Sequence, residues 1–404
     1  MTLIQKETMI KHFIIAFLLC RILFILYFTF KYRFWSKQPV FHSYNIWYWL
    51  FPPGIIEHSS PKLGKFFDRS IITKNYKDLN SSQKSDIYRL IYSHYLQEKN
   101  IKYNPTRKSI FKYLQNHDSP AHVSLFYKKK PLYDVSNKQS IISDKLISVI
   151  TSRPLYCFFH KNEMLINYVD YLCVHKDNRK KGTAPKIIYT HTSRVRNNSK
   201  SITFLFKREN DVSLPIIPLS TFYTYGFDTR LWKYSSKPIP QYSSFMLNVQ
   251  NINTFYHIIR KIKQNKTCVV YPALSNLSTL IKNKLLFIYM LLEKDNPVAC
   301  YIFRSPFTDY KRENNTGNSI DCIGSFFDKK LNPEIFIYYF YFFVFSLQKK
   351  NPFKYLVIEN ISDNNYIIQN IFKKFVPMIK SPGAYYFYNF AHRPIISDKM
   401  FIIH

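Results

Sequence analysis

The 404-residue sequence is poor in glycine and in acidic residues. It has only 7 glycines, so a glycine inside a basic turn, Gly182, is noteworthy. Aspartate and glutamate number 25 against 58 lysines and arginines, which gives a formal net charge of +33. Such a charge attracts polyanions: nucleic acid, an anionic membrane or a phosphate-rich cosubstrate. A lysine- and asparagine-rich composition without any specific partner explains the charge equally well, because the basic residues are spread along the chain.

The sequence also lacks the spacings of metal and redox sites. Its six cysteines contain no CxxC pair, which argues against a zinc ribbon or a redox dithiol. No cluster of histidine, cysteine and acidic residues has ligand spacing, so we expect no metal site. Scattered cysteines in a large chain fit a reducing compartment, and we expect a cytoplasmic protein.

A cleaved signal peptide is not indicated, although residues 13–30 form a long apolar run. Lys6 and Lys11 precede the run, but no A-x-A-type cleavage site follows it. The run contains thirteen Leu, Ile and Phe residues and one central charge, Arg21. On insertion scales the apolar gain narrowly exceeds the cost of the arginine. Membrane association through residues 13–30 is one prediction, and a buried or surface-lying helix is the alternative.

The order of predicted elements indicates an α+β fold with a mixed sheet and an internal duplication. Strand patterns fill residues 122–175, a helix follows at 184–196, and another strand comes after it. The second half repeats this order loosely, with strands before a helix at 333–349 and a strand after it. We expect three parts: an apolar segment at 1–31, a first half at 32–230 and a second half at 231–404.

The stretch YLCVHKDNRKKGTAPKII, residues 171–188, carries the clearest functional signal. An apolar strand leads into the turn DNRKKG, and Thr183 begins a helix. Free N–H groups at a helix start carry partial positive charge and bind phosphates. Gly182 allows close backbone approach, and Arg179, Lys180 and Lys181 add charge. The pattern R-x-x-G-x-A predicts a pyrophosphate site, with a solvated basic turn as the alternative.

Three motifs in this chain resemble those of the glycylpeptide N-myristoyltransferase family. Residues 172–185 are similar to its L-C-V-H-K-x-x-R-x-x-x-x-A-P signature. FWSKQPV, residues 34–40, resembles its F-W-x-x-Q-P-V element, and YYFYNF, residues 385–390, is similar to its Y-Y-L-Y-N-W strand. The motifs occur in the family's order, so the resemblance spans about residues 32–404.

The resemblance implies two pseudo-symmetric halves, each like an acyl-CoA N-acyltransferase (a GNAT-like fold). It also implies a reaction: the glycine amine at the N-terminus of a protein or peptide takes myristate directly from myristoyl-CoA. No permanently bound cofactor is expected, and myristoyl-CoA acts as cosubstrate. No specific nucleic acid partner is implied.

Family roles carry over to matching positions. Backbone N–H groups of Tyr171 and Leu172 are implied as the oxyanion hole, and the main-chain carboxylate of His404 as the base, because the family uses its C-terminus. The final run MFIIH is apolar, as a buried terminus requires. The implied cosubstrate-binding residues are Tyr32, Phe34, Trp35, His175, Lys176, Arg179, Lys180, Lys181, Gly182, Thr183, Ala184 and Pro185. The implied peptide-binding residues are Tyr103, Tyr223, Tyr225 and Tyr386.

The peptide-binding half departs from the family pattern more than the CoA-binding half does. The acidic run near the first helix is reduced to YLQEKN, residues 95–100, and Tyr225 stands where the family has histidine. We therefore expect no preference for basic residues in the peptide. Two alternatives remain: an acyl-CoA N-acyltransferase for another chain or amine, and a decayed family member that only binds membrane or nucleic acid.

Overall fold

The computed structural model describes residues 3–61, 63–98, 100–134, 139–210, 212, 214–230, 232, 237–312 and 315–404. The helices are α1 (Leu3–Lys31), α2 (Ile46–Leu50), α3 (Ser81–His94), α4 (Arg107–Lys112), α5 (Thr183–Asn198), α6 (Thr254–Asn265), α7 (Leu274–Lys282), α8 (Pro333–Lys350) and α9 (Asn364–Phe372). The strands are β1 (Gly54–Ile55), β2 (Ile72–Asn75), β3 (Ile101–Tyr103), β4 (His122–Asp134), β5 (Gln139–Phe159), β6 (Asn162–Val174), β7 (Phe204–Glu209), β8 (Ser220–Asp228), β9 (Tyr242–Met246), β10 (Cys268–Tyr271), β11 (Leu286–Glu293), β12 (Asn296–Arg304), β13 (Thr308–Arg312), β14 (Asn315–Phe327), β15 (Tyr355–Glu359), β16 (Ile379–Tyr388), β17 (Phe390–Ala391) and β18 (Met400–Ile402).

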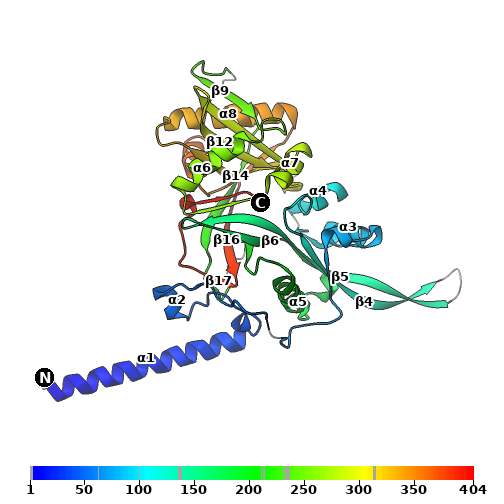
Figure 1. The fold of residues 1–404 in the computed structure, drawn as a ribbon, viewed down its shortest axis with the longest axis vertical. Helices are drawn as coiled ribbons and strands as arrows, with labels where there is room; N and C mark the ends of the chain where they lie inside the picture. The colour runs from blue at the N-terminus through cyan, green and yellow to red at the C-terminus, as the bar shows by residue number, and fades with distance from the viewer. Residues whose placement is uncertain are drawn as a thin grey trace.

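One mixed sheet runs through both halves of the molecule (Figure 1). Its central order is β18-β10-β5-β6-β7-β16-β8-β15-β14-β12-β11-β9. Helices α3 and α5 pack against the strands of the first half, and α6, α7 and α9 pack against those of the second. The prediction of an α+β fold with a large mixed sheet is confirmed.

The two halves repeat one arrangement. In the first half, β4, β5 and β6 are antiparallel, and α5 connects β6 to the parallel strand β7. In the second half, β11, β12 and β14 are antiparallel, and α8 connects β14 to the parallel strand β15. The halves also exchange strands, because β7 pairs with the late strand β16 and β15 pairs with the early strand β8.

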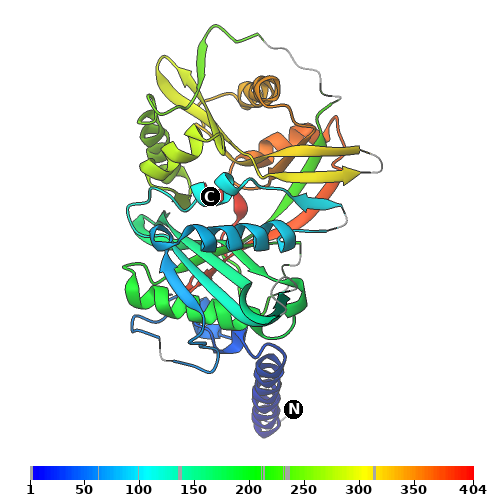
Figure 2. The same ribbon diagram turned by 90° about the vertical axis from the view of Figure 1, so that its right-hand side faces the viewer.

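The last residues of the chain lie at the centre of the molecule, between the two halves (Figures 1 and 2). Strand β18 pairs in parallel with β10, and the N–H of Ile403 donates to the carbonyl of Val270 at 2.8 Å. Residues 400–404 are all buried. The apolar character of this run is thus explained by its burial.

Helix α1 projects away from the body of the protein (Figure 1). Its segment Thr8–Lys31 is long and apolar enough to cross a membrane, with a mean hydropathy of 2.5, and only 6% of it is buried. The alternative of a buried helix is therefore wrong for residues 13–30. The exposed helix leaves both a spanning and a surface-lying arrangement open.

Candidate active site

The candidate site begins where β6 and β7 separate. These parallel strands pair only at Asn167, Tyr168 and Val169 of β6. Asp170 is a β-bulge, because Thr151 of β5 pairs with Tyr171 and the next residue, Ser152, pairs with Val169. Bulges redirect a strand and often lie beside active sites. Beyond the bulge and near the end of β6, Leu172 is 37% exposed between the buried residues Tyr171 and Cys173, and we call the place where it meets solvent the opening.

The two residues expected to form the oxyanion hole come directly after this bulge. The N–H of Tyr171 donates to the Thr151 hydroxyl oxygen at 3.2 Å. The Tyr171 side chain points to the opposite face, where its hydroxyl lies 2.6 Å from the hydroxyl of Tyr103. A predicted peptide-binding residue therefore contacts a predicted catalytic residue, through side chains in a buried aromatic cluster with Tyr95.

A pocket of 310 Å³ lies at the end of β6, around the turn that precedes α5. It is lined by Val174 and Asn178 together with six of the residues predicted to bind the cosubstrate, namely Arg179, Lys180, Gly182, Thr183, Ala184 and Pro185. Gly182 is the N-cap of α5 with φ +74°, and a Cβ there would have no heavy atom within 4 Å. The glycine is thus required by the left-handed backbone, and its open side faces free space.

The charged side chains of this turn differ in their surroundings. Arg179 donates to the carbonyl of Val174 at 3.2 Å and to that of His94 at 2.5 Å, so its guanidinium ties the turn to the end of α3. Lys176, Lys180 and Lys181 are exposed. His175 is buried, its ring lies 4.1 Å from that of His94, and its Nδ1 accepts from the Asp177 N–H at 3.3 Å.

The early motif FWSKQPV and the late motif YYFYNF meet in space. The Tyr388 hydroxyl donates to Gln38 Oε1 at 3.0 Å, and the Asn389 N–H donates to the carbonyl of Pro39 at 2.7 Å. Phe34 is buried, while Tyr32 and Trp35 are half-buried, and Trp35 stacks on Phe206 of β7. Of the aromatic residues predicted to cover the cosubstrate, Trp35 therefore lies against the strand that borders the opening.

His404 lies on the face of β6 opposite α5, among aromatic and charged side chains. Its ring is 5.0 Å from that of Tyr168, which belongs to the last paired stretch of β6 and β7. Arg304 Nη1 donates to His404 Nε2 at 2.8 Å. Since arginine keeps its protons, Nε2 is the acceptor and the imidazole proton is on Nδ1. Burial and then the charge of Arg304 hold the pKa of His404 well below its usual range, so the ring is neutral.

Three cations act electrostatically on His404, and each is paired with a carboxylate, which makes a group of six charged side chains. We call them the interface cluster: Arg153, Asp170 and Lys207 from the first half, and Arg304, Asp321 and Glu359 from the second. The ion pairs are Arg153–Asp170 at 2.9 Å, Arg304–Asp321 at 2.8 Å and Lys207–Glu359 at 2.7 Å, and the last of these joins the halves. Each buried charge is thus paired, as burial requires.

Burial dominates the protonation behaviour of the cluster carboxylates. It raises the pKa of Asp321 to about 6, although Arg304 acts in the opposite direction. It also raises the pKa of Asp170 against the effect of Arg153. Within the described part of the chain, three buried polar atoms of the cluster find no hydrogen-bond partner: Arg153 Nη2, Arg304 Nε and Glu359 Oε2. Unsatisfied polar atoms at this density mark a place where a polar ligand or water fits.

Of the remaining predicted peptide-binding residues, Tyr223 and Tyr225 lie together on β8, with ring centroids 6.2 Å apart, and Tyr386 lies on β16. Tyr223 is exposed on β8, with Lys380 Nζ 4.8 Å from its ring centroid. Tyr225 is buried against Phe372 in the core of the second half. Tyr386 donates to the carbonyl of Val212 at 2.7 Å. It is Tyr385, the preceding residue, whose hydroxyl lies 3.4 Å from His404 Nδ1.

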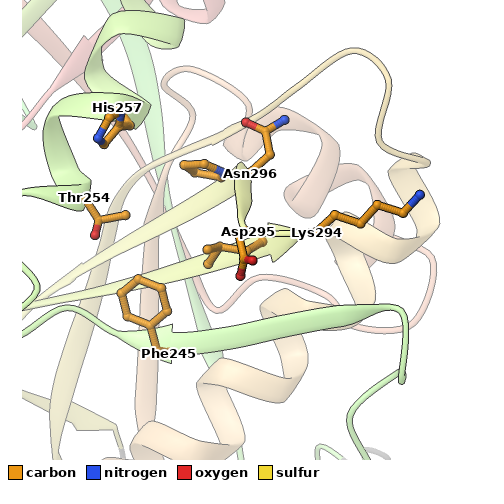
Figure 3. A pocket seen from close by; sticks show the side chains of 8 residues that line it. Phe245, Thr254, His257, Lys294, Asp295 and Asn296 are labelled. Carbon is orange, nitrogen blue, oxygen red and sulfur yellow. The ribbon is translucent and has the colours of Figure 1, made fainter.

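A second pocket, of 510 Å³, lies in the second half between β9, α6 and the turn joining β11 to β12 (Figure 3). Its ionisable lining residues, His257, Lys294 and Asp295, are exposed. They point in different directions in the close-up, so no convergent group of polar atoms is formed by these described residues (Figure 3). The first pocket, at the start of α5, is the better candidate for binding a cosubstrate.

Sequence reasoning missed Thr151, Arg153, Asp170 and Arg304. Two of them carry a recognisable signal, since Arg153 and Arg304 are charged residues inside the long apolar runs ISVITSRPLYCFF and VACYIFRS. A charge within a buried strand needs a partner or a function. Asp170 and Thr151 give no such signal, because their roles depend on the bulge.

Comparison with known proteins agrees with this geometry. Residues 70–206 match the family model described as the N-terminal domain of myristoyl-CoA:protein N-myristoyltransferase. A structure of Saccharomyces cerevisiae N-myristoyltransferase with bound myristoyl-CoA is similar, with a TM-score of 0.68 at 15% identity, over 90% of this chain and 94% of that one. A second structure of the yeast enzyme with myristoyl-CoA gives 0.68 at 14% identity, over 92% and 94%. No curated protein sequence matches the chain.

Proposed function

The chain is a member of the N-myristoyltransferase family through residues 70–206, and from that premise we propose that it transfers myristate from myristoyl-CoA to N-terminal glycine amines. The fold and the family match indicate an acyl-CoA N-acyltransferase. The observation that carries the finer proposal is the opening at the bulge of β6. It has a phosphate-binding turn at one end and the buried terminus, His404, on its other side.

The phosphate turn supports binding of the CoA moiety. The start of α5 presents backbone N–H groups that have no partner within the helix, next to Lys180 and Lys181. The pocket at this start is adjacent to Val174, the last residue of β6. A pyrophosphate bound there leaves the pantetheine arm to follow β6 toward the bulge, where the thioester would lie beside Leu172.

At the thioester, the amine nitrogen attacks the carbonyl carbon. A C–N bond forms, the C–S bond breaks, and CoA leaves as a thiolate that takes up a proton. Negative charge develops on the carbonyl oxygen, and preorganised N–H donors stabilise it. Tyr171 and Leu172 supply these donors in the proposal. The acyl oxygen would replace the Thr151 hydroxyl as acceptor for the Tyr171 N–H, which that hydroxyl now keeps satisfied.

Attack requires a neutral amine, and an α-amino group has a pKa near 8. A modest base is sufficient, and the proposal assigns it to the main-chain carboxylate of His404. Two features support this assignment. The residue is buried at the junction of the halves, and Arg304 holds its neutral ring in place. A neutral ring adds no positive charge that would lower the basicity of the neighbouring carboxylate.

The proposal for peptide specificity rests on the surroundings of Tyr223. Lys380 lies against the exposed ring of Tyr223 on β8, so this predicted peptide contact is next to a cation. We infer that lysines downstream of the substrate glycine give no gain in turnover. A panel of glycine peptides with lysine or serine at these positions checks this, and faster transfer to the lysine series would contradict it.

The deciding experiment is transfer of labelled myristate from myristoyl-CoA to peptides that begin with Gly or, as a control, with Ala. The native chain is compared with one extended by two residues after His404 and one extended by the same residues before Met1. We expect transfer to the Gly peptide only, and a loss of at least about a hundredfold in the C-terminal extension alone.

The other outcomes separate the alternatives. Equal activity in both extended chains would exclude the terminal carboxylate as the base. Preference for another acyl-CoA in a series of chain lengths would favour the related N-acyltransferase. Binding of myristoyl-CoA without any transfer would favour a decayed enzyme.

A further inference from the structure

A compact apolar patch on the first half is left exposed by the fold. Helix α2 and the residue after it present five large apolar side chains to solvent: Ile46, Trp47, Trp49, Leu50 and Phe51. Trp47 is 65% exposed and Phe51 is 71% exposed. Single exposed apolar residues are ordinary, but a contiguous aromatic group marks an interaction site. We call these five residues the α2 patch.

The α2 patch is held firmly by the body of the protein. Arg393, from the segment after β17, donates to the carbonyl of Trp49 at 2.7 Å and to that of Leu50 at 2.8 Å. Asn45 caps the start of the helix by accepting from the Tyr48 N–H at 3.3 Å. Phe41, which is buried, packs against the rings of Tyr48 and Trp49. The exposure of the patch is therefore imposed by the fold.

Helix α1 begins its path away from the body directly beside this patch. The ring of Phe28, near the end of α1, lies 5.9 Å from that of Tyr44, two residues before α2. The apolar segment Thr8–Lys31 has 24 residues, which at 1.5 Å per residue gives about 36 Å, more than the roughly 30 Å of a bilayer's hydrocarbon core. The α2 patch thus continues the apolar surface of α1, which is itself long enough to cross the hydrocarbon core of a bilayer.

The charges of this region fit a lipid surface. From Thr8 to Ile56 the sequence contains no acidic residue. Lys31, Arg33 and Lys37 follow the apolar segment and are all exposed. Basic residues at the end of an apolar helix are attracted to anionic headgroups by about 1 kcal/mol each. Tryptophan favours the zone between headgroups and acyl chains, and two of the five patch residues are tryptophans.

We propose that the α2 patch is a membrane-contact surface, which enters the headgroup zone of an anionic bilayer while α1 inserts into the same bilayer. A protein partner on the patch would leave the exposed apolar length of α1 unexplained, whereas one bilayer accounts for both. Arg21 lies in the middle of α1, and in a bilayer its long side chain would extend its charged end toward the surface.

This arrangement fixes the acyl-transfer site close to the lipid. Only Tyr32, Arg33 and Phe34 separate the end of α1 from Trp35, which stacks on β7 beside the opening. A single myristoyl chain gives only marginal, reversible membrane binding. Under the proposed function, a product released at this position would meet a bilayer at once. The membrane contact itself does not depend on catalysis.

Tryptophan fluorescence tests the proposal, because two of the four tryptophans are in the patch. The other two are Trp35, which is half-buried on β7, and Trp232, which is buried. The full chain is reconstituted with vesicles of phosphatidylcholine and phosphatidylserine that contain phosphatidylcholine brominated near the carbonyl end or near the methyl end of its chain. We expect strong quenching by the former and weaker quenching by the latter.

Two variants make the test specific. The double variant Trp47→Phe and Trp49→Phe should lose most of the quenched emission. Adding Val376→Trp to it provides a matched control, since Val376 is an exposed apolar position in the second half, and the new tryptophan should not be quenched. Quenching that persists in the double variant, or its absence in the native chain, would overturn the proposal. Equal quenching without phosphatidylserine would overturn its anionic part.

Discussion

The two places where parallel strands separate, β6–β7 in the first half and β14–β15 in the second, are built alike. In the first half pairing ends at Val169 and the bulge is Asp170. In the second half pairing ends at Cys322 and the bulge is Ile323, because Ile302 pairs with Gly324 and Phe303 with Cys322. The residue after each bulge therefore occupies an equivalent position, Tyr171 in one half and Gly324 in the other.

The strand segments beyond the two bulges have different surroundings. Leu172 is 37% exposed, whereas its counterpart Ser325 is fully buried. The Ser325 hydroxyl donates to Asn364 Oδ1 at 2.6 Å, and the Phe327 N–H donates to Asp363 Oδ2 at 3.1 Å. The start of α9 thus fills the second opening with its own polar groups. The repeated fold therefore creates two openings, and one of them has become part of the core.

The equivalence extends to two buried arginines. Arg153 pairs with Tyr168 and Arg304 pairs with Asp321, and each of these is the second residue pair after the bulge. Both lie in the interface cluster, but Arg153 binds the bulge residue Asp170 and Arg304 binds its cross-strand neighbour Asp321. The repeat therefore places one arginine from each half near the buried C-terminus, and of the two it is Arg304 that donates to His404.

Filling the first opening, so that it resembles the second, should reduce acyl transfer more than any other change proposed here. Leu172→Trp adds bulk where the second half is already filled. We expect acyl transfer to fall by about a thousandfold, or about 4 kcal/mol, because the thioester is excluded from its donors. Stability should change little, since the site is partly open. Steady-state kinetics and thermal unfolding measure the two effects, and Leu172→Met is the size-matched control. Full activity in the tryptophan variant would contradict the assignment of the opening.

The next largest expected effect is on the pH dependence of stability, and it comes from the carboxylates that pair with Arg153 and Arg304. Burial raises the pKa of Asp321 to about 6, against about 3.8 unfolded. Between these values the folded protein binds the proton more tightly, so this group's contribution to stability is present below pH 4 and is lost as pH rises to 6. Two pKa units correspond to about 3 kcal/mol.

The test compares the native protein with Asp321→Asn, in which that titration is absent. The free energy of unfolding of the variant relative to the native protein should rise by about 3 kcal/mol from pH 4 to pH 6.5. The attraction between Arg304 and the carboxylate is already part of this pKa, so its loss in the variant adds no separate pH dependence. The free energy of unfolding of Asp170→Asn, relative to the native protein, should also rise with pH, since the pKa of Asp170 is raised as well. A difference that is constant with pH would contradict this. Urea unfolding across the range measures it.

Much of the framework was predictable from sequence patterns. The predicted helix at 184–196 is α5, and the one at 333–349 is α8, because a capped start and apolar periodicity are local properties. The turn before α5 was predictable for the same reason, since one contiguous stretch forms it, whereas its role in binding phosphate stays a prediction. The burial of residues 400–404 agrees with their apolar character.

The remaining features depend on contacts between distant segments. Strands β10 and β18 are short, and these two strands and β8 pair with segments more than a hundred residues away, so no local pattern revealed them. The bulge at Asp170 is a relation between two strands. The filling of the second opening depends on α9 folding back onto β14. Pairwise geometry of this kind is absent from composition and periodicity.

Removing the filler of the second opening should cost stability without affecting cosubstrate binding. Asn364 is fully buried, and its Nδ2 donates to the carbonyl of Glu359 at 2.8 Å and to that of Cys322 at 3.2 Å. Asn364→Ala leaves these groups unsatisfied, for an expected loss of about 2 kcal/mol. Asn365→Ala, the next residue on α9, is the control and should be near neutral. Urea unfolding and myristoyl-CoA binding check both. A weakened affinity for myristoyl-CoA would show that the second opening takes part in the site.

The smallest expected effects come from the N-caps of α5 and α8. Substituting either cap should lower the free energy of unfolding by about 1 kcal/mol. Gly182 caps α5 in the left-handed region at φ +74°, whereas Asn332 caps α8 by accepting from the Glu334 N–H at 2.9 Å. Gly182→Ala should cost about 1 kcal/mol of backbone strain, and Asn332→Ala about 1 kcal/mol of lost capping. Only the first lies in the phosphate pocket, so only Gly182→Ala should weaken CoA binding, by about fivefold. Isothermal titration with CoA checks the difference. Equal affinities in the two variants would mean that the phosphates bind elsewhere, and the opening at Leu172 would then need another route for its cosubstrate.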